Sequence, residues 1–226
     1  KKYLFKGKFQ DMKKNIISVL IQFILIIPGY AQDIWTPTQG PWGLELSDFL
    51  ISSNDLWVAS ATSDGIYFSQ DKCTTWSKRS RGLYKSNSYA SDLASAPDGT
   101  IYALIEDELY FMNPMTSEWE KTIFKFPNSV VQVGANGYVC VLSQLLGTRI
   151  YVSKDRAESF QLVYQNNMNL VYNLSFNGND NNFFVTSESS DYYLFRFADN
   201  GSEIKPLRKS DPGFNNLLWH PSGKLL

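Results

Sequence analysis

Short apolar runs alternate with clusters of glycine, asparagine, aspartate and serine along most of the chain. Leu56–Ala59 and Thr100–Leu104 are two of these runs, and each is bounded by turn-forming residues. Such a pattern is typical of short β-strands joined by turns. Beyond residue 31, no window keeps the 3.6-residue period of an amphipathic helix. The pattern therefore predicts an all-β protein and excludes a helical solenoid.

The runs recur at a regular spacing when each unit is aligned on one residue, its anchor. The anchors are separated by 43, 41 and 44 positions: Trp76, Trp119, Phe160 and Ile204. Ten and nine positions before each anchor stand an aliphatic and an aromatic residue: Ile66 and Tyr67, Leu109 and Tyr110, Ile150 and Tyr151, Leu194 and Phe195. Polar hairpin turns also recur upstream, at residues 52–55, 96–99, 134–137 and 177–180.

A period of about 40 to 45 residues with four strands per unit is the signature of a β-propeller. We expect four-stranded antiparallel blades in repeats at about 44–87, 88–129, 130–168 and 169–212. A fifth repeat would begin at 213–226, so residues 32–226 would be part of a larger propeller.

The turn before each anchor carries a second repeated pattern. Residues 69–76 and 153–160 share the form Ser-x-Asp-x-small-x-Thr/Ser-aromatic. We expect each Asp to accept hydrogen bonds from groups a few residues on, closing the turn between the third and fourth strands. The residues of this pattern are Ser69, Asp71, Thr75, Trp76, Ser153, Asp155, Ser159, Phe160 and, in a weaker fourth copy, Asp199 and Gly201. The second copy retains only Trp119. The role expected for all of them is stability, not catalysis.

The pattern resembles the Asp-box, or BNR repeat, of sialidase-like β-propellers. Residues 34–43, Ile-Trp-Thr-Pro-Thr-Gln-Gly-Pro-Trp-Gly, look like the start of secreted Bacteroidetes propellers that resemble photosystem II assembly factors. In such proteins this strand joins the last blade. The resemblance covers most of residues 33–226 and implies a fold, whereas fold alone does not imply function.

Sialidase chemistry does not follow from the resemblance. A sialidase needs an arginine triad, and the chain has no Arg-Ile-Pro motif near its N-terminus. The candidate arginines lie in the boxes, just after them or on the strands that lead into them: Arg79, Arg81, Arg149, Arg156 and Arg196. No catalytic, cofactor-binding or metal-binding residue is therefore predicted.

Other chemistry-bearing residues also have structural interpretations. The acidic run Glu106–Glu108 is read as a solvated hairpin turn. The single histidine, His220, has no second histidine nearby, so neither a zinc site nor a Ser-His-Asp triad is supported. Cys73 and Cys140 fall in different repeats and are expected to remain unpaired.

The N-terminal segment predicts export. Met12 and two lysines precede an apolar run, Ile16–Ile27, and small residues follow up to Ala31. This is the order of a secretory signal peptide at residues 12–31, and the apolar run is too short to cross a bilayer, which takes about 20 residues. Cleavage would fall after Ala31 and leave no stable membrane insertion, while residues 1–11 are interpreted as leader or non-native extension.

Removal of residues 1–31 leaves 15 basic and 21 acidic residues, a net charge of −6. The remaining basic residues are scattered, so a nucleic-acid partner is not expected. We expect a secreted, periplasmic or cell-surface scaffold that binds protein or glycan without a cofactor. Two alternatives stay open. One is a propeller glycoside hydrolase with catalytic residues partly beyond Leu226. The other is the periplasmic sensor propeller of a two-component regulator, because residues 87–93 and 97–103 faintly resemble the repeat of that family.

Overall fold

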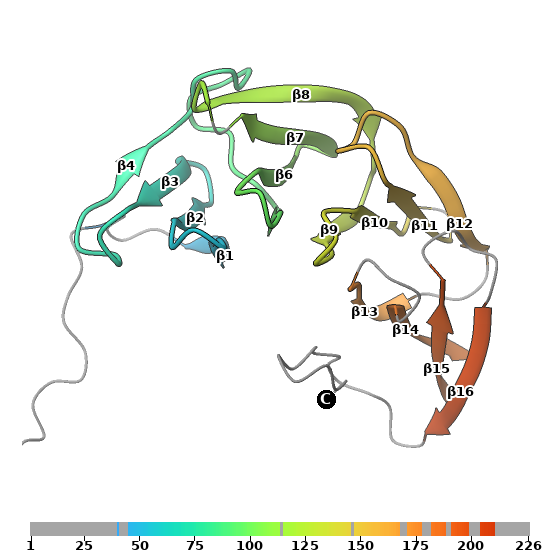
Figure 1. Ribbon diagram of the computed structural model, residues 1–226. Coiled ribbons are helices and arrows are strands. Elements are labelled where there is room, and N and C mark those ends of the chain that lie inside the picture. The colour runs from blue at the N-terminus through green and yellow to red at the C-terminus, as the bar shows by residue number, and fades with distance from the viewer. Residues whose placement is uncertain are drawn as a thin grey trace, which may run out of the picture. The chain divides into compact units, whose positions relative to one another are not determined.

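A computed structural model of the chain describes residues 40, 45–113, 115–145, 147–167, 171–177, 182–188, 191–198 and 204–210 (Figure 1). Every regular element in these ranges is a β-strand. The strands form four antiparallel sheets, each built from four strands that are consecutive in the chain. The prediction of an all-β fold with four-stranded blades is confirmed. The predicted signal peptide and the start of a fifth repeat lie outside the described residues.

The first sheet contains β1 (Leu46–Ile51), β2 (Trp57–Ala61), β3 (Gly65–Ser69) and β4 (Ser77–Lys78). The second sheet contains β5 (Asp92–Ser95), β6 (Ile101–Ile105), β7 (Glu108–Asn113) and β8 (Glu118–Lys125). The third contains β9 (Ser129–Val133), β10 (Val139–Ser143), β11 (Thr148–Ser153) and β12 (Gln161–Asn166). The fourth contains β13 (Val171–Ser175), β14 (Asn182–Glu188), β15 (Asp191–Phe197) and β16 (Ile204–Ser210).

The hairpin turns predicted from the sequence join the first and second strands of the first three sheets. In each, one residue closes the turn with both of its backbone groups: the Ala96 N–H donates to the Thr100 carbonyl at 2.8 Å, and the Ala96 carbonyl accepts from the Gly99 N–H at 3.0 Å. The same turn position has a positive φ in all three: 58° at Asp55, 89° at Gly99 and 81° at Gly137. Glycine and aspartate adopt this left-handed conformation at low cost. Most of the fourth turn, residues 178–180, lies outside the described residues.

The second strands are buried on both faces. All five residues of β6 and all five of β10 are buried, whereas β8, the fourth strand of its sheet, alternates between buried and exposed positions. A strand can be apolar throughout only when both faces of its sheet are covered. The runs Ile101–Ile105 and Val139–Ser143 therefore indicate that the second and third sheets each have a neighbour on both sides.

Three hydrophobic cores join neighbouring sheets. The first contains Phe68 of β3 together with Ile101 of β6, the second contains Tyr102 of β6 together with Val139 of β10, and the third joins the third and fourth sheets. Consecutive residues of β6, Ile101 and Tyr102, point to opposite faces and thus serve two different cores, as expected for a repeat that cannot bury its faces alone.

Two of the anchor residues, Trp119 and Phe160, lie at these junctions and contact the preceding sheet. The Trp119 ring lies 6.2 Å from that of Phe68, and its Nε1 donates to the Arg79 carbonyl at 3.0 Å. The Phe160 ring lies 4.9 Å and 5.0 Å from the rings of Phe124 and Phe126. The anchor therefore stabilises the contact between two blades as well as its own turn.

Trp119→Phe should lower the free energy of unfolding by about 1–2 kcal/mol, because it removes a buried hydrogen bond and some packing volume. Trp76→Phe is the matched control: among the described residues, the buried indole N–H of Trp76 has no acceptor. That substitution should cost less, since no hydrogen bond is lost. Denaturant unfolding of both variants makes the comparison, and equal losses would show that the Trp119 bond contributes nothing.

Candidate functional site

The turn at residues 69–76 is closed by its own side chains. Asp71 Oδ1 accepts from the Thr75 backbone N–H at 2.8 Å, and Oδ2 accepts from the Thr75 hydroxyl at 2.7 Å. The Ser69 hydroxyl donates to Asp71 Oδ1 at 2.8 Å and accepts from the Cys73 N–H at 2.9 Å. The Thr75 side-chain and backbone hydrogen bonds lower the pKa of Asp71 to about 2.

The second turn repeats this arrangement. Asp155 Oδ1 accepts from the Ser159 N–H at 2.9 Å, and Oδ2 accepts from the Ser159 hydroxyl at 2.5 Å. Ser153 donates to Asp155 at 2.7 Å and accepts from the Ala157 N–H at 2.8 Å. The hydrogen bonds from Ser159 lower the pKa of Asp155 to about 2. The carboxylates and hydroxyls of the pattern are thus all bonded within their own turns, which suits a structural role.

The small residues in the two turns occupy left-handed positions. Cys73 has a φ of 68° and Ala157 a φ of 69°, and each follows a second residue with positive φ, Lys72 or Arg156. Bulky or β-branched side chains resist this conformation. Because Lys72 and Arg156 adopt the same conformation, the backbone disfavours β-branched residues at this position but does not by itself require a small one.

In the second repeat, Asn113 closes the turn in place of the missing aspartate, which was not predicted from the sequence. Asn113 Oδ1 accepts from the Met115 N–H at 2.9 Å and, at 3.4 Å, from the Thr116 N–H. An asparagine at the start of a turn commonly makes this bond, so Asn113 followed by a proline was the available signal. In the fourth repeat, Asp199 and Gly201 lie outside the described residues.

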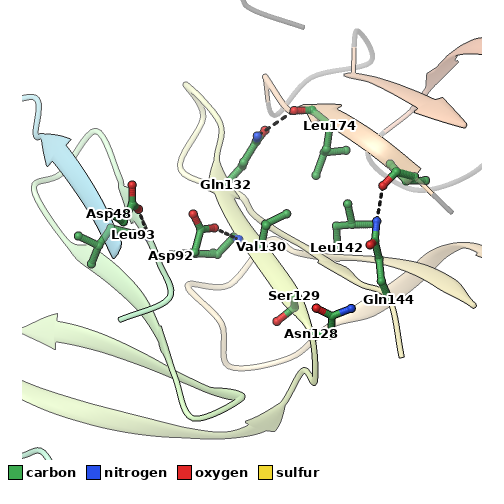
Figure 2. A pocket seen from close by; sticks show the side chains of 12 residues that line it. Asp48, Asp92, Leu93, Asn128, Ser129, Val130, Gln132, Leu142, Gln144 and Leu174 are labelled. Atoms are coloured by element: carbon green, nitrogen blue, oxygen red, sulfur yellow. Dashed lines mark hydrogen bonds between the residues drawn. The ribbon is translucent and has the colours of Figure 1, made fainter. Parts of the chain in front are cut away.

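A polar pocket lies along the first strands of the four sheets (Figure 2). Its volume is about 460 Å³, and we call it the inner-strand pocket. Residues from all four sheets line it, and its polar members are Asp48, Asp92, Asn128, Ser129, Gln132 and Gln144. None of these residues is among those that the sequence pattern predicted to be important.

Three polar side chains of the pocket bond across neighbouring sheets. The Leu93 N–H donates to Asp48 Oδ2 at 2.6 Å, and the Val131 N–H donates to Asp92 Oδ2 at 2.5 Å. Gln132 uses both ends of its amide: Nε2 donates to the Leu174 carbonyl at 2.8 Å, and Oε1 accepts from the Phe176 N–H at 2.8 Å. Figure 2 shows these bonds pointing from each inner strand to the next. The signal in the sequence was the Ser-Asp pair at 47–48 and again at 91–92.

Burial sets the electrostatics of the two carboxyl groups. Desolvation is the main cause that raises the pKa of Asp92 to about 7, and the charge of Asp48 adds to it. Desolvation also raises the pKa of Asp48, against the hydrogen bonds that it accepts. Because a like charge opposes the second ionisation, the pair of Asp48 and Asp92 retains one proton below about pH 7.

Two amides complete the polar lining. Gln144 donates its Nε2 hydrogen to the Val171 carbonyl. The side-chain amide of Asn128 makes no hydrogen bond within the described part of the chain, although its backbone N–H donates to Asp107 at 3.3 Å. Asn128 is exposed and has a φ of 47°. It offers both a donor and an acceptor to a ligand.

The other candidate residues are placed apart from this pocket. Glu106 and Asp107 form the exposed turn between β6 and β7, and Glu108 pairs with Lys121 and Lys125 at 2.7 Å each. Arg81 pairs with Glu118 at 2.7 Å, and Arg156 pairs with Asp98 at 3.0 Å.

Cys73 and Cys140 are both free thiols, as expected from their repeats, and Cys140 is buried in the third core. Within the described ranges, no cluster of three or more His, Cys, Asp and Glu side chains could hold a metal ion. The same ranges contain no helix with the length and apolarity to cross a membrane.

Antiparallel four-stranded sheets that share cores with their neighbours, with first strands around a polar pocket, define a β-propeller. Two solved propellers are similar to this chain. One is YCF48 bound to D1 peptide, with a TM-score of 0.60 and 17% identity over 85% of this chain and 63% of that one. The other is YCF48 from Cyanidioschyzon merolae, with a TM-score of 0.57 and 12% identity over 81% of this chain and 62% of that one.

YCF48 is a photosystem II assembly factor, and at these identities the likeness shows the fold alone. The chain spans less than two thirds of the length of either structure. No protein-family model and no curated protein matches the sequence.

Ser153→Ala should lower the free energy of unfolding by about 1–3 kcal/mol, because the N–H of the buried Ala157 loses its acceptor. Ser86→Ala is the control: Ser86 is exposed and its hydroxyl makes no hydrogen bond among the described residues. Denaturant unfolding should leave this variant unchanged. A Ser153→Ala protein as stable as wild type would contradict a stabilising role for Ser153.

Asp92→Asn should make stability less dependent on pH. In the wild-type protein the pKa of Asp92 rises from 3.8 to about 7 on folding. The folded state therefore binds the proton more tightly, so the contribution of Asp92 to stability is fully present below about pH 4 and is lost as the pH rises through 7. Asparagine mimics the protonated acid, because it can accept from Val131 and donate to Asp48.

The Asp92→Asn variant should match wild type near pH 4 and exceed it by about 1–3 kcal/mol at pH 8. Asp55→Asn, at an exposed turn residue, should leave the pH profile unchanged. Unfolding free energies measured from pH 4 to 8 give the comparison. Parallel profiles for wild type and Asp92→Asn would contradict the raised pKa.

Proposed function

We propose that this chain is a non-catalytic propeller scaffold that binds a segment of another protein at the inner-strand pocket. The observation that carries the proposal is the pocket's construction. Side chains from all four sheets line it, and hydrogen bonds between sheets hold Asp48, Asp92 and Gln132 in place. A site whose side chains are already ordered loses little entropy when a ligand binds.

The lining favours a polypeptide over a glycan. None of the described residues that line the pocket is aromatic; the apolar ones are Leu93, Val130, Val131, Leu142, Val171 and Leu174. Sugar rings are commonly held against flat aromatic faces, whereas aliphatic walls with a few polar groups suit the side chains and backbone of a peptide. The similar YCF48 structure with a bound D1 peptide supports a polypeptide ligand for this architecture.

The charges specify the ligand further. Asp48 and Asp92 are partly desolvated carboxyl groups with no cationic side chain among the residues that line the pocket. A lysine or arginine of the partner would offset that desolvation. We therefore expect a segment with one basic side chain between apolar residues, bound more tightly above pH 7, where Asp92 is ionised.

Selection of displayed peptides on the complete protein tests the proposal. The selected peptides should carry a basic residue and bind more tightly at pH 8 than at pH 6. Asn128→Ala should weaken binding about fivefold, as expected for one lost hydrogen bond. Asn87→Ala, at an exposed amide outside the pocket, is the matched control. Asp92→Asn should abolish the pH dependence.

Two results would contradict the proposal. One is selection of peptides whose affinity is indifferent to Asn128 and Asp92. The other is binding of glycans but of no peptide on arrays of both, which would return the glycan alternative to first place.

We also propose that residues 12–31 direct export of the scaffold. The basic start, the apolar run Ile16–Ile27 and the small residue Ala31 support this. Mass spectrometry of the exported protein should find Gln32 at the N-terminus, and Ala31→Arg should block the cleavage. An uncleaved protein retained in the cytoplasm would refute export.

A further inference from the structure

A second groove, of about 550 Å³, lies between the second sheet and the Asp-box turn of the third. Residues of β6, β7 and β8 form one side, and Arg156, Ala157 and Glu158 of the turn form the other. We call it the box-turn groove. No residue lines both this groove and the inner-strand pocket.

The groove is lined by exposed apolar side chains and by aromatic side chains that are more buried. Met115 and Ile123 are 94% and 89% exposed, which is unusual for large apolar side chains. Beside them, Tyr102 is buried and Phe111 is half-buried. Exposed apolar side chains that rim a hollow mark an interaction site. A thioether and a branched aliphatic chain, with no fully exposed ring, suit an apolar protein side chain better than a sugar.

Arg156 supplies the open charge of the groove. Its side chain is 76% exposed, and one of its N–H groups pairs with Asp98 at 3.0 Å. Asp98 is itself held by the Thr100 N–H at 3.0 Å. Arg156 has five N–H donors and is largely exposed, and Asp98 is its one ion-pair partner among the described residues, so donors remain for a ligand. The other cation, Lys121, is already paired with Glu108 at 2.7 Å. A carboxylate that bonds two guanidinium N–H groups at once is the complement of Arg156.

The backbone that carries Arg156 is rigid. The Asp-box hydrogen bonds of Ser153 and Asp155 close the turn, and Ala157 is buried in the second core. Glu158 also lines the groove and would repel an acidic group placed beside it. The charge pattern therefore confines a partner's carboxylate to the Arg156 end.

We infer that the box-turn groove docks a protein segment that inserts an aliphatic side chain between Met115 and Ile123 and places a carboxylate on Arg156. This site is independent of the inner-strand pocket, whose ligand is basic. The same scaffold would then contact an acidic segment on one surface and a basic one on another.

Methionine-methyl NMR of the complete protein tests the inference. The probes are acetylated, amidated heptapeptides with one leucine and one aspartate at each spacing, and a matched set with asparagine in place of aspartate. The exposed Met115 methyl signal should shift on titration, while the buried Met112 signal should not. The aspartate peptides should bind at least about tenfold more tightly than their asparagine counterparts, because only they pair with Arg156.

Three groove variants and two matched controls sharpen the result. Arg156→Gln should remove the preference for aspartate, whereas Arg81→Gln, at an arginine of similar exposure with one ion pair, should not. Ile123→Ser should weaken both peptide sets, and Leu162→Ser, at an exposed leucine outside the groove, should weaken neither. Glu158→Gln should strengthen binding of aspartate peptides.

Asn128→Ala, which tests the inner-strand pocket, should leave these titrations unchanged. Failure of one site is thus distinguishable from failure of the other. An unchanged Met115 signal at millimolar peptide, or equal affinities for the aspartate and asparagine sets, would overturn the inference. So would a Met115 shift caused by oligosaccharides and not by peptides.

Discussion

Each blade of this propeller is stable only in contact with its neighbours. No sheet of four short strands can cover both of its own apolar faces, so each shares a core with the next. The inner-strand bonds of Asp48, Asp92 and Gln132 add direction to that apolar contact, because each fixes the first strand of one blade against that of its neighbour. The pocket exists because those strands are held together.

The aspartates show how position decides the role of one side-chain type. Asp71 and Asp155 lie exposed in turns, surrounded by donors, and hydrogen bonds depress their pKa to about 2. Asp92 lies between blades with Asp48 nearby, and burial raises its pKa to about 7. The first two are occupied within their own turns and stabilise them locally. The third is still able to exchange a proton or meet a cation near neutral pH, which is why the candidate site lies there.

Local features of the fold were readable from the chain. The blade period, the hairpin turns and the turns around Asp71 and Asp155 each depend on residues within one repeat, so their spacing was informative. The prediction was less complete where a different residue does the same work, as Asn113 does in the second repeat. The candidate site was not predicted, since Asp48 and Asp92 look like ordinary polar residues of short strands.

The fold class, the four-strand repeat and the hydrogen-bonded turns around Asp71 and Asp155 follow from turn residues and apolar periodicity over a few tens of positions, so the amino-acid sequence was enough to predict them. Which polar side chains meet depends on how the sheets pack. Asp48 bonds Leu93 and Gln132 bonds Leu174 across more than forty positions of the chain, and Arg156 reaches Asp98 from another blade. Such pairings arise when packed sheets bring distant strands together, and the inner-strand pocket and the box-turn groove are their consequence.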